Sequence, residues 1–292
     1  MPSAPPQTPG DTSPPIPSLL RLVNFIFHDV LEDEFTISGF SGPGADWYKL
    51  SLANFEALLD TISANSRYPL EHLAESASIP PPSNATLLTF DDGGASCFDP
   101  IAGTLESRGL RARFFVVTAR LGQPGFLSVG QCRELAARGH IVGSHSESHP
   151  AVFSGLPKQI QVNEWRNSRI MLEQLIGSDI TSASVPGGNF SRTVAASAAE
   201  AGYKLLFTSE PVTRVSRGPE GLLVAGRVML TKASHAPEVA ALARCSASAM
   251  SKRWLLWNGR KVLKRSLRPL YDRIRLRIIE RQGPETRNPP KR

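Results

Sequence analysis

Short apolar segments alternate with longer amphipathic segments along the middle of this 292-residue chain, and this alternation limits the possible folds most strongly. Apolar runs rich in Val, Leu and Phe are typical of buried strands, whereas apolar residues at every third or fourth position are typical of helices. We predict strands over 85–90, 112–118, 140–143, 182–186 and 204–208, with helices over 99–108, 128–138, 158–176 and 194–201. Strands that alternate with helices form βαβ units, so we expect these strands to pair in parallel.

The regions on both sides of this alternation contain further elements. A strand is predicted over 20–30, a helix over 50–62 with Ser51 as its N-cap, and a late strand over 226–230. The segment 32–46 contains glycines and acidic residues without a clear period, and it is predicted to be a loop. No internal repeat is visible.

Composition excludes several classes of protein. Hydrophobic residues make up 41% of the chain and charged residues 20%, so it can bury a core and is not a disordered or fibrous protein. It has no run of 18 apolar residues, which argues against a membrane-spanning helix. Cys97, Cys132 and Cys245 are odd in number and widely spaced, so we expect reduced, buried thiols.

Charge is concentrated towards the C-terminal end. Residues 251–292 contain 14 Lys/Arg and 3 Asp/Glu, whereas the preceding 250 residues contain 19 and 23. The body therefore lacks a basic surplus, which argues against nucleic-acid binding. Residues 1–19 contain seven prolines and no basic residue, and we predict an extended, disordered leader that is not a secretory signal. A cytoplasmic location is expected on this basis.

Polar clusters lie at the ends of four predicted strands. They are His28-Asp29, Asp91-Asp92, the segment from His145 to His149, and Pro186-Gly187-Gly188. In parallel α/β barrels the reactive residues lie at the carboxyl ends of the strands. We therefore expect these four clusters to converge on one site.

The histidines and paired aspartates suit a metal site. His145 and His149 are spaced i, i+4, which would place both imidazoles on one face of a helical turn. With a carboxylate they would form a site with open positions, of a kind that zinc favours and other divalent metals also use. Each cluster is ambiguous alone, since Asp-Asp-Gly-Gly is also ordinary turn chemistry. Two carboxylates are costly to bury unpaired, however, and a metal could bind one and leave the other as a base.

Two of these clusters resemble the motifs of a known family. Thr89-Phe90-Asp91-Asp92-Gly93 resembles the first motif of the polysaccharide deacetylases, also called the NodB homology domain or carbohydrate esterase family four. His145-Ser146-Glu147-Ser148-His149-Pro150 resembles the second motif, and the separation of about fifty residues also agrees. The resemblance covers approximately 85–230. His28-Asp29-Val30 more weakly resembles the start of deacetylases that act on poly-N-acetylglucosamine.

This resemblance implies a fold, a reaction and a set of roles. The fold would be an α/β deformed (β/α) barrel, and the reaction would remove N-acetyl groups from an amino-sugar glycan or its lipid-linked precursor. Asp92, His145 and His149 would hold one divalent metal, with zinc favoured and other metals open. Asp91 would be the general base for the attacking water, and the backbone N–H of Gly187 would stabilise the oxyanion.

The third motif departs from the family pattern. Ser184 stands where the family usually has an Arg that pairs with the catalytic Asp. Gly187 stands where an aromatic side chain would stack on the substrate, so the substrate-binding residues are not identified. Arg227 is a candidate replacement for the missing Arg, although a surface role is favoured for it.

The general acid is also not marked by its usual motif. The late strand over 226–230 is not followed by Leu-x-His, so His28 is our better candidate and His235 the weaker one. Trp165 and Phe190 are predicted to be core residues and not sugar platforms.

We predict three regions: the leader at 1–19, a catalytic barrel at 20–250 with its motif core at about 85–230, and a basic amphipathic helical tail at 251–292. Trp254 and Trp257 stand at the start of the tail. The tail would either pack on the barrel with a solvated basic face or lie on anionic lipid through 251–281. In the second case a cytoplasmic deacetylase would act at the inner membrane.

Three functions remain open from the sequence. The favoured one is a metal-dependent N-deacetylase of glycans. A related hydrolase of a small amide or cyclic ureide is the second, because the third motif lacks its aromatic side chain. The third is a non-catalytic carbohydrate-binding or scaffolding relative that lost turnover with the Arg that Ser184 replaces and with the absent general acid, although the retained Asp91 argues against it.

Overall fold

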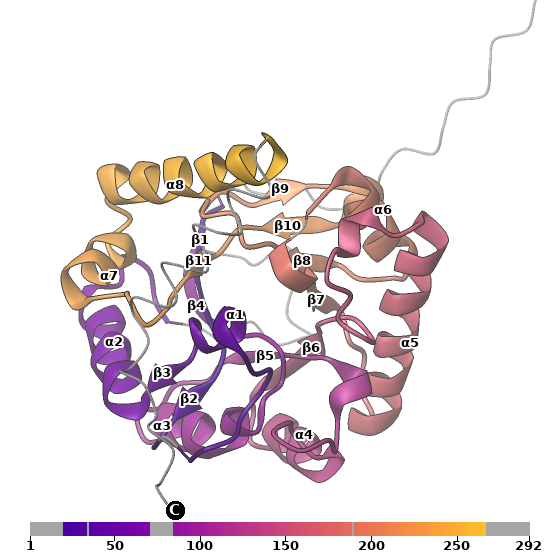
Figure 1. Cartoon of the computed structure of the whole chain (residues 1–292), viewed down its shortest axis with the longest axis horizontal. Helices are drawn as coiled ribbons and strands as arrows, with labels where there is room; N and C mark the ends of the chain where they lie inside the picture. The colour runs from indigo at the N-terminus through magenta and orange to yellow at the C-terminus, as the bar shows by residue number, and fades with distance from the viewer. Residues whose placement is uncertain (1–19, 34, 71–83, 189, 267–292) are drawn as a thin grey trace, which may run out of the picture.

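A curled sheet of nine strands forms the centre of the molecule (Figure 1). The computed structural model describes residues 20–33, 35–70, 84–188 and 190–266, with side chains as far as 259. The strands are β1 (Leu22–Phe27), β4 (Ala85–Phe90), β5 (Arg113–Val116), β6 (Ile141–Ser144), β7 (Ser182–Ser184), β8 (Leu205–Phe207), β9 (Ser216–Arg217), β10 (Leu223–Ala225) and β11 (Val228–Met229). Their order is β11-β1-β4-β5-β6-β7-β8-β10-β9, and each neighbouring pair is parallel except β9 with β10.

The sheet curls until its two sides approach each other. The backbone N–H of Leu22 in β1 donates to the carbonyl of Thr213, which lies shortly before β9. Arg21 and Arg214 form an antiparallel bridge at the same place. The result is an open, deformed (β/α) barrel, as predicted. The proposed leader, 1–19, lies outside the described residues.

Helices cover the outside of the barrel (Figure 1). They are α1 (Pro43–Asp46), α2 (Leu52–Asn65), α3 (Gly103–Glu106), α4 (Val129–Ala137), α5 (Lys158–Ile176), α6 (Arg192–Glu200), α7 (Ala236–Ala243) and α8 (Ala247–Ser266). Ser51 caps α2 and Ser128 caps α4, each by accepting a hydrogen bond from a backbone N–H in the first turn. No helix in the described ranges is both long and apolar enough to cross a bilayer.

The predicted elements are present, and several short ones were missed. The predicted helix over 158–176 has the same bounds as α5, whereas the one over 99–108 is divided into a π-type turn at Phe98–Ala102 and α3. The predicted loop over 32–46 contains α1 and lies between two short paired strands, β2 (Val30–Leu31) and β3 (Leu50–Ser51). Strands of two residues, such as β9, are too short to produce a sequence period.

Alternate residues of each strand face two different environments. One face packs under the helices and includes Phe25, Phe27, Phe90 and Phe114, and the other forms a second apolar cluster that includes Leu22, Leu87, Phe115 and Phe207. The second cluster contains no helix residue, so it fills the inside of the barrel. The inner face continues at Asp91, Ser184 and Arg227. Each of these residues lies two positions beyond a residue of its strand that faces inwards, so it faces inwards as well.

Gly226 allows the backbone of 210–212 to approach β10 and β11. A Cβ at this position would lie 2.6 Å from the carbonyl oxygen of Val212 and closer still to that of Glu210. Backbone atoms cannot move aside as a flexible side chain can. We therefore predict that Gly226→Ala lowers the free energy of unfolding by about 1–3 kcal/mol.

Urea denaturation of the full chain measures this effect. Gly130→Ala in α4 is the matched control, since its Cβ would come no closer than 3.9 Å to another atom. That variant should be neutral or more stable by up to about 1 kcal/mol, because alanine is the better helix former. Equal stabilities of the two variants would contradict the role assigned to Gly226.

Candidate active site

Asp92, His145 and His149 come together at the carboxyl ends of β4 and β6, as predicted from the sequence. Asp92 Oδ1 lies 3.4 Å from His145 Nε2 and 3.7 Å from His149 Nε2. The ligand atoms of the three residues all lie within 4.8 Å of one another, and no other such group of three occurs in the described part of the chain. Asp92 and His145 are buried and His149 is partly exposed, so the group opens towards solvent on one side.

The backbone that carries these residues is not the helical turn that the spacing suggested. Residues 145–149 form a loop after β6, and Ser146 and His149 have φ angles of 65° and 56°. Asp92 also has a positive φ, of 75°. Non-glycine residues rarely adopt this conformation, and such strained positions cluster at functional sites. The two imidazoles therefore meet through loop geometry and not through helical periodicity.

The three side chains fit a divalent cation. His145 Nδ1 lies 3.0 Å from the carbonyl oxygen of Ser184, which fixes a proton on Nδ1 and turns Nε2 towards Asp92. Burial lowers the pKa of His149 to about 4, so its imidazole is neutral near pH 7. Burial raises the pKa of Asp92, but the hydrogen bond to His145 and the nearby imidazole charges outweigh it and hold the pKa well below its usual range. Two imidazoles and an ionised carboxylate are the donors that zinc and similar metals use.

Asp91 forms a buried ion pair with Arg227. Arg227 Nη1 lies 2.7 Å from Asp91 Oδ1 and Nη2 lies 2.8 Å from Oδ2, so both carboxylate oxygens accept from one guanidinium group. The Ser184 hydroxyl donates to Asp91 at 3.1 Å and accepts from Arg227. Arg227 is fully buried and its Nε donates to the carbonyl of Thr208. The surface role favoured for Arg227 is therefore wrong, and Arg227 supplies the charge that Ser184 lacks.

This ion pair determines the charge of Asp91. Burial raises the pKa of Asp91, but the positive charge of Arg227, the charge of His145 and the hydrogen bonds from Arg227 together outweigh burial and lower the pKa below its ordinary value. The pKa of His145 is raised above its ordinary value. Burial lowers this pKa, but Asp91 and Asp92 together raise it by more. With its pKa raised, His145 binds a proton more readily. A divalent cation between the two carboxylates and this imidazole would take the place of that proton.

His28 lies beside the aspartates, as predicted, and His235 does not. The charge of His28 contributes to the low pKa of Asp92, and its ring stacks on Tyr48 with the centroids 4.9 Å apart. His28 Nδ1 is buried and has no hydrogen-bond partner among the described residues. His235 is at the N-cap of α7 with its side chain 68% exposed, 3.7 Å from Glu238.

Asp29 fixes the loop that follows β4, a role that the sequence did not reveal. Its Oδ1 accepts hydrogen bonds from Ser38 at 2.5 Å and Ser96 at 2.9 Å. Gly39 and Gly94 approach the carboxylate so closely that a Cβ at either position would collide with it. Burial raises the pKa of Asp29. The carboxylate therefore holds the glycine-rich end of the first motif against β1.

The third motif forms a tight turn without an aromatic side chain. Gly187 has φ 60° and ψ 12°, in the left-handed region that favours glycine. A Cβ on Gly188 would lie 3.1 Å from the indole ring of Trp257, so α8 packs against this turn. Phe190 was predicted to be a core residue, but its side chain is 36% exposed, so that prediction is wrong. Trp165 was also predicted to be a core residue, and it is fully buried in the core.

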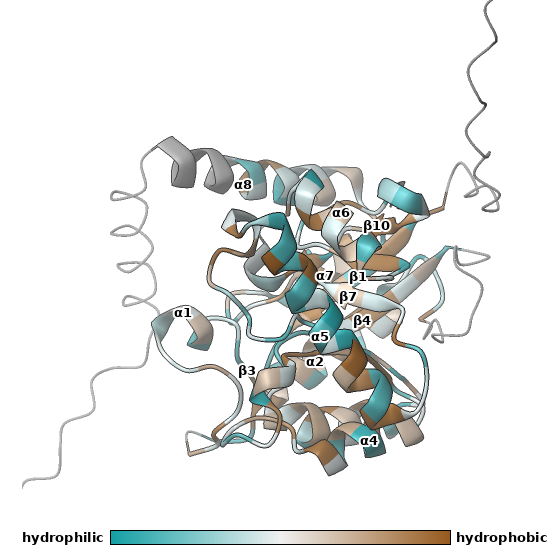
Figure 2. Cartoon of the chain, turned by 90° about the vertical axis from the view of Figure 1, so that its right-hand side faces the viewer, coloured by the Kyte–Doolittle hydropathy of each residue, from teal (hydrophilic) through white to brown (hydrophobic). Residues whose placement is uncertain are grey.

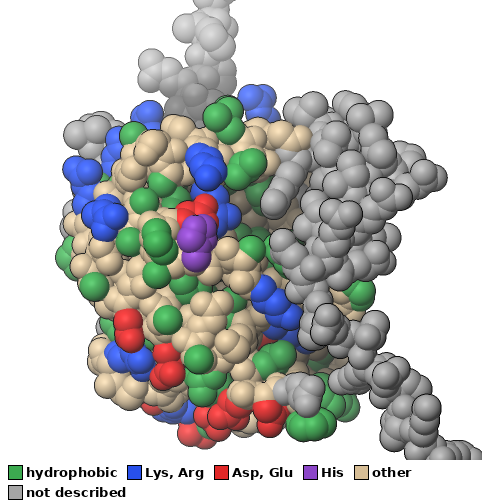
Figure 3. Space-filling model, turned by 60° about the vertical axis from the view of Figure 1, so that its left-hand side comes forward, with side chains coloured by type: hydrophobic (Ala, Val, Ile, Leu, Met, Phe, Trp, Pro, Cys, Tyr) green, Lys and Arg blue, Asp and Glu red, His purple; other side chains and the backbone are tan. Residues whose placement is uncertain are grey.

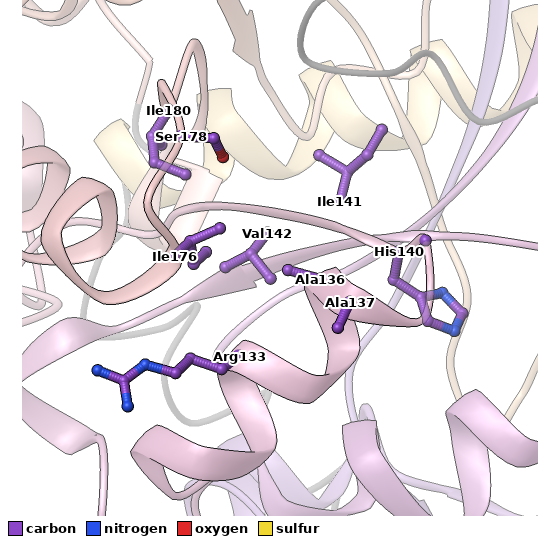
Figure 4. Close-up of a pocket in the computed structure, with 10 residues that line it drawn as sticks. Arg133, Ala136, Ala137, His140, Ile141, Val142, Ile176, Ser178 and Ile180 are labelled. Atoms are coloured by element: carbon purple, nitrogen blue, oxygen red, sulfur yellow. The ribbon is translucent and has the colours of Figure 1, made fainter.

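A separate cavity of about 480 Å³ lies at the beginning of β6 (Figure 4). Its lining comes from the C-terminal part of α4, from residues 139–142 at the start of β6, and from the end of α5 with the residues after it. Arg133 and His140 are its charged or titratable side chains. His140 Nε2 bonds to Glu106, and Arg133 donates to the carbonyl of Leu175. His145 lies at the opposite end of β6, so this cavity is not part of the site.

Comparison with known proteins identifies the fold and the motifs. A family model described as polysaccharide deacetylase matches residues 78–206, which contain both aspartates and both histidines of the site. Residues 78–206 are thus similar to the polysaccharide deacetylase family. A Bacillus subtilis protein named as a polysaccharide deacetylase, YxkH, is 28% identical over 131 residues, which cover 45% of this chain and 47% of YxkH.

Two further relatives extend this comparison. The peptidoglycan-N-acetylglucosamine deacetylase of Bacillus cereus is 31% identical over 90 residues, which are 30% of each chain. The solved structure of IcaB from Ammonifex degensii has a similar fold, with a TM-score of 0.60 at 24% identity over 78% of this chain and 98% of IcaB. The chain thus spans less than half the length of the curated deacetylases that it matches.

The Asp91–Arg227 pair provides a test of the site's electrostatics. We predict that Arg227→Met costs about 3–5 kcal/mol of folding free energy, because Asp91 would stay buried without a countercharge. Combining it with Asp91→Asn should cost less than the sum of the single changes, with a coupling energy of about 1–3 kcal/mol. Urea denaturation of the four proteins in this cycle measures the coupling.

The Arg169–Glu173 pair on α5 is the matched control. It is also an Arg–carboxylate contact, at 2.7 Å, but both side chains are more than a quarter exposed. Its coupling energy should be only about 0.3–0.5 kcal/mol. A coupling of the same small size at Asp91 and Arg227 would show that the buried pair is unimportant for the fold.

Proposed function

We propose that this chain is a metal-dependent hydrolase that removes N-acetyl groups from an amino-sugar glycan. The observation that supports it most is the buried pair of ionised aspartates, one bonded to Arg227 and the other facing two imidazoles. Sequence kinship to a peptidoglycan-N-acetylglucosamine deacetylase favours an N-acetylated sugar as the substrate.

Each role in the reaction goes to a residue at the carboxyl ends of the strands. Asp92, His145 and His149 would hold the divalent cation, which when bound polarises the acetyl carbonyl and makes water a stronger nucleophile. Asp91, kept ionised by Arg227, would accept the proton of the attacking water. The backbone N–H of Gly187 would donate to the oxyanion, a group whose stabilisation is a large part of acyl-transfer catalysis.

His28 would give a proton to the departing amine. It lies next to Asp92, and its side chain is partly exposed. The ring of Tyr48 stacks on the imidazole of His28. His235 is exposed on α7 and does not compete for this role.

The two other functions are less well supported. The non-catalytic hypothesis depended on the absence of the third-motif Arg and of the usual general acid. Arg227 supplies the missing charge to Asp91, and His28 is the proposed acid. A small amide or cyclic ureide as substrate remains compatible with the metal ligands, but the relatives named above are deacetylases of polysaccharides and peptidoglycan. We therefore keep it as an outcome of the activity test.

Acetate release from N-acetylglucosamine oligomers tests the proposed function. We expect turnover by the wild type, its loss with a chelator and its recovery with zinc. Asp91→Asn should lower kcat by at least about a hundredfold, since an amide cannot accept the proton. Asp60→Asn is the control, because Asp60 lies on α2 with its side chain 64% exposed and pairs with Arg108.

Three results would contradict the proposed function, each in a different way. Turnover that a chelator does not affect would reject the metal-dependent mechanism. Hydrolysis of a small amide or ureide without acetate release from the oligomers would replace the glycan by the second substrate class. Equal activity of Asp91→Asn and Asp60→Asn would remove Asp91 as the base.

We further propose that α8 places the enzyme on an anionic membrane surface, where a lipid-linked saccharide would be within reach. Trp254, Leu255 and Leu256 are 43%, 63% and 49% exposed on this helix. Residues 251–292 have a large excess of Lys and Arg. Basic side chains also lie mostly in the upper half of the face in Figure 3, which is the end of the molecule that carries α8, while acidic side chains gather along its lower edge.

Vesicle binding tests this proposal. We predict that the full chain sediments with vesicles of phosphatidylglycerol and not with phosphatidylcholine alone, and that Leu255→Glu with Leu256→Glu weakens this binding at least tenfold, because charged groups resist entry into the interface. Ile170→Glu is the control, since Ile170 is similarly exposed, at 45%, but lies on α5. Equal sedimentation of the α8 variant and the control would contradict a membrane role for this helix.

A further inference from the structure

The third motif has no side chain able to contact the apolar face of a sugar. Gly187 and Gly188 occupy the turn after β7, and the indole of Trp257 packs against Gly188. Ligand sites are nevertheless lined mainly by hydrophobic and aromatic side chains, with few polar groups that fix orientation. Another part of the chain must therefore supply this lining if the substrate is a pyranose.

One ring lies against the metal-ligand histidine nearest to solvent. The centroid of Phe40 is 5.0 Å from that of His149, with 43° between the ring planes. Phe40 also contacts Phe126 edge-on at 5.2 Å, and the Arg120 guanidinium lies 5.4 Å from its centroid. The ring is half-buried, so it is held in place on one side and accessible on the other.

A second ring lies against the candidate acid. Tyr48 stacks on His28, with 28° between the ring planes, and is also half-buried. Phe40 and Tyr48 come from one segment, the connection between β2 and β3 that contains α1. Figure 1 shows α1 in front of the centre of the barrel, and Figure 2 shows it projecting from that end of the molecule.

The segment is fixed to the floor of the site near both rings. Ser38 donates to the buried Asp29, and Gly39 N–H donates to the carbonyl of Gly125 at 2.7 Å. At the other end, Leu50 N–H donates to the carbonyl of Asp29, and Leu50 pairs with Val30 in the short sheet. These contacts fix the position of the backbone next to Phe40 and Tyr48 relative to His149 and His28.

We propose that Phe40 and Tyr48 form the sugar-binding walls of the active site, in place of the aromatic residue that the third motif lacks. The inference rests on the proposed function. An N-acetylated pyranose would pack its apolar C–H face on these rings while its acetamido group lies between Asp91 and the metal ligands. The preference for a sugar over a small amide would then depend on this segment.

The test compares two substrates and two kinds of substitution. Phe40→Leu and Tyr48→Leu remove the rings but keep apolar side chains, whereas Phe40→Tyr and Tyr48→Phe keep the rings. We expect the leucine variants to raise KM and the dissociation constant for the N-acetylglucosamine tetramer about tenfold, in line with the loss of one aromatic contact. Hydrolysis of an aryl acetate, which has no sugar ring, should change less than about twofold.

Phe35→Leu is the matched control. Phe35 belongs to the same segment but is 78% exposed, so its removal should leave both substrates unaffected. The ring-retaining variants should also bind the tetramer like the wild type. They keep the test decisive if a leucine variant fails to fold.

The outcomes separate this inference from the proposed function. Equal losses on the tetramer and the aryl acetate would show that the rings only position His149 and His28, and would overturn the inference. Unchanged tetramer binding in the leucine variants would overturn it too, while acetate release by the wild type would leave the proposed function intact. A wild type that neither binds nor deacetylates the tetramer would overturn both.

Discussion

The buried ion pair between Asp91 and Arg227 is the interaction on which the site depends. Asp91 and Asp92 are adjacent and both buried, and two carboxylates in such a place cannot both be ionised without nearby positive charge. Arg227 provides that charge to Asp91 through two hydrogen bonds, and Ser184 joins both partners. Asp92 faces His145 and His149 instead, so each carboxylate has its own partners and the two can take different roles.

Strand geometry explains how residues far apart in the chain reach one place. In a parallel barrel the carboxyl ends of neighbouring strands lie at one end, and every second residue points inwards. Arg227 follows β10 and lies 136 residues from Asp91, yet both occupy the inner face just beyond their strands. Because Gly226 has no side chain, the backbone of 210–212 can lie beside Arg227. The backbone N–H of Arg227 donates to the carbonyl of Glu210. The position of the guanidinium group is thus a consequence of close backbone packing.

The sequence predicted the parts of the site that lie in contiguous motifs and missed those that depend on distant packing. Asp91, Asp92 and the two histidines were identifiable because apolar strands precede them directly. Arg227 was assigned to the surface because a short strand of two residues, β11, has no period that reveals which face it buries. The strong period of α5 fixed its bounds, but the loop geometry of 145–149 depends on positive φ angles that spacing does not encode.

Residues outside the third motif provide groups that surround Asp91 and Asp92. The guanidinium group that the third motif lacks comes from the end of β10, and the space beside Gly188 that a larger residue would need is occupied by Trp257 of α8. Because a Cβ at Gly188 would already lie 3.1 Å from that indole, α8 leaves little room for a larger side chain at this position of the turn. The third motif has no aromatic side chain, and Phe40 and Tyr48, which lie against His149 and His28, are where the proposed sugar contact would be made.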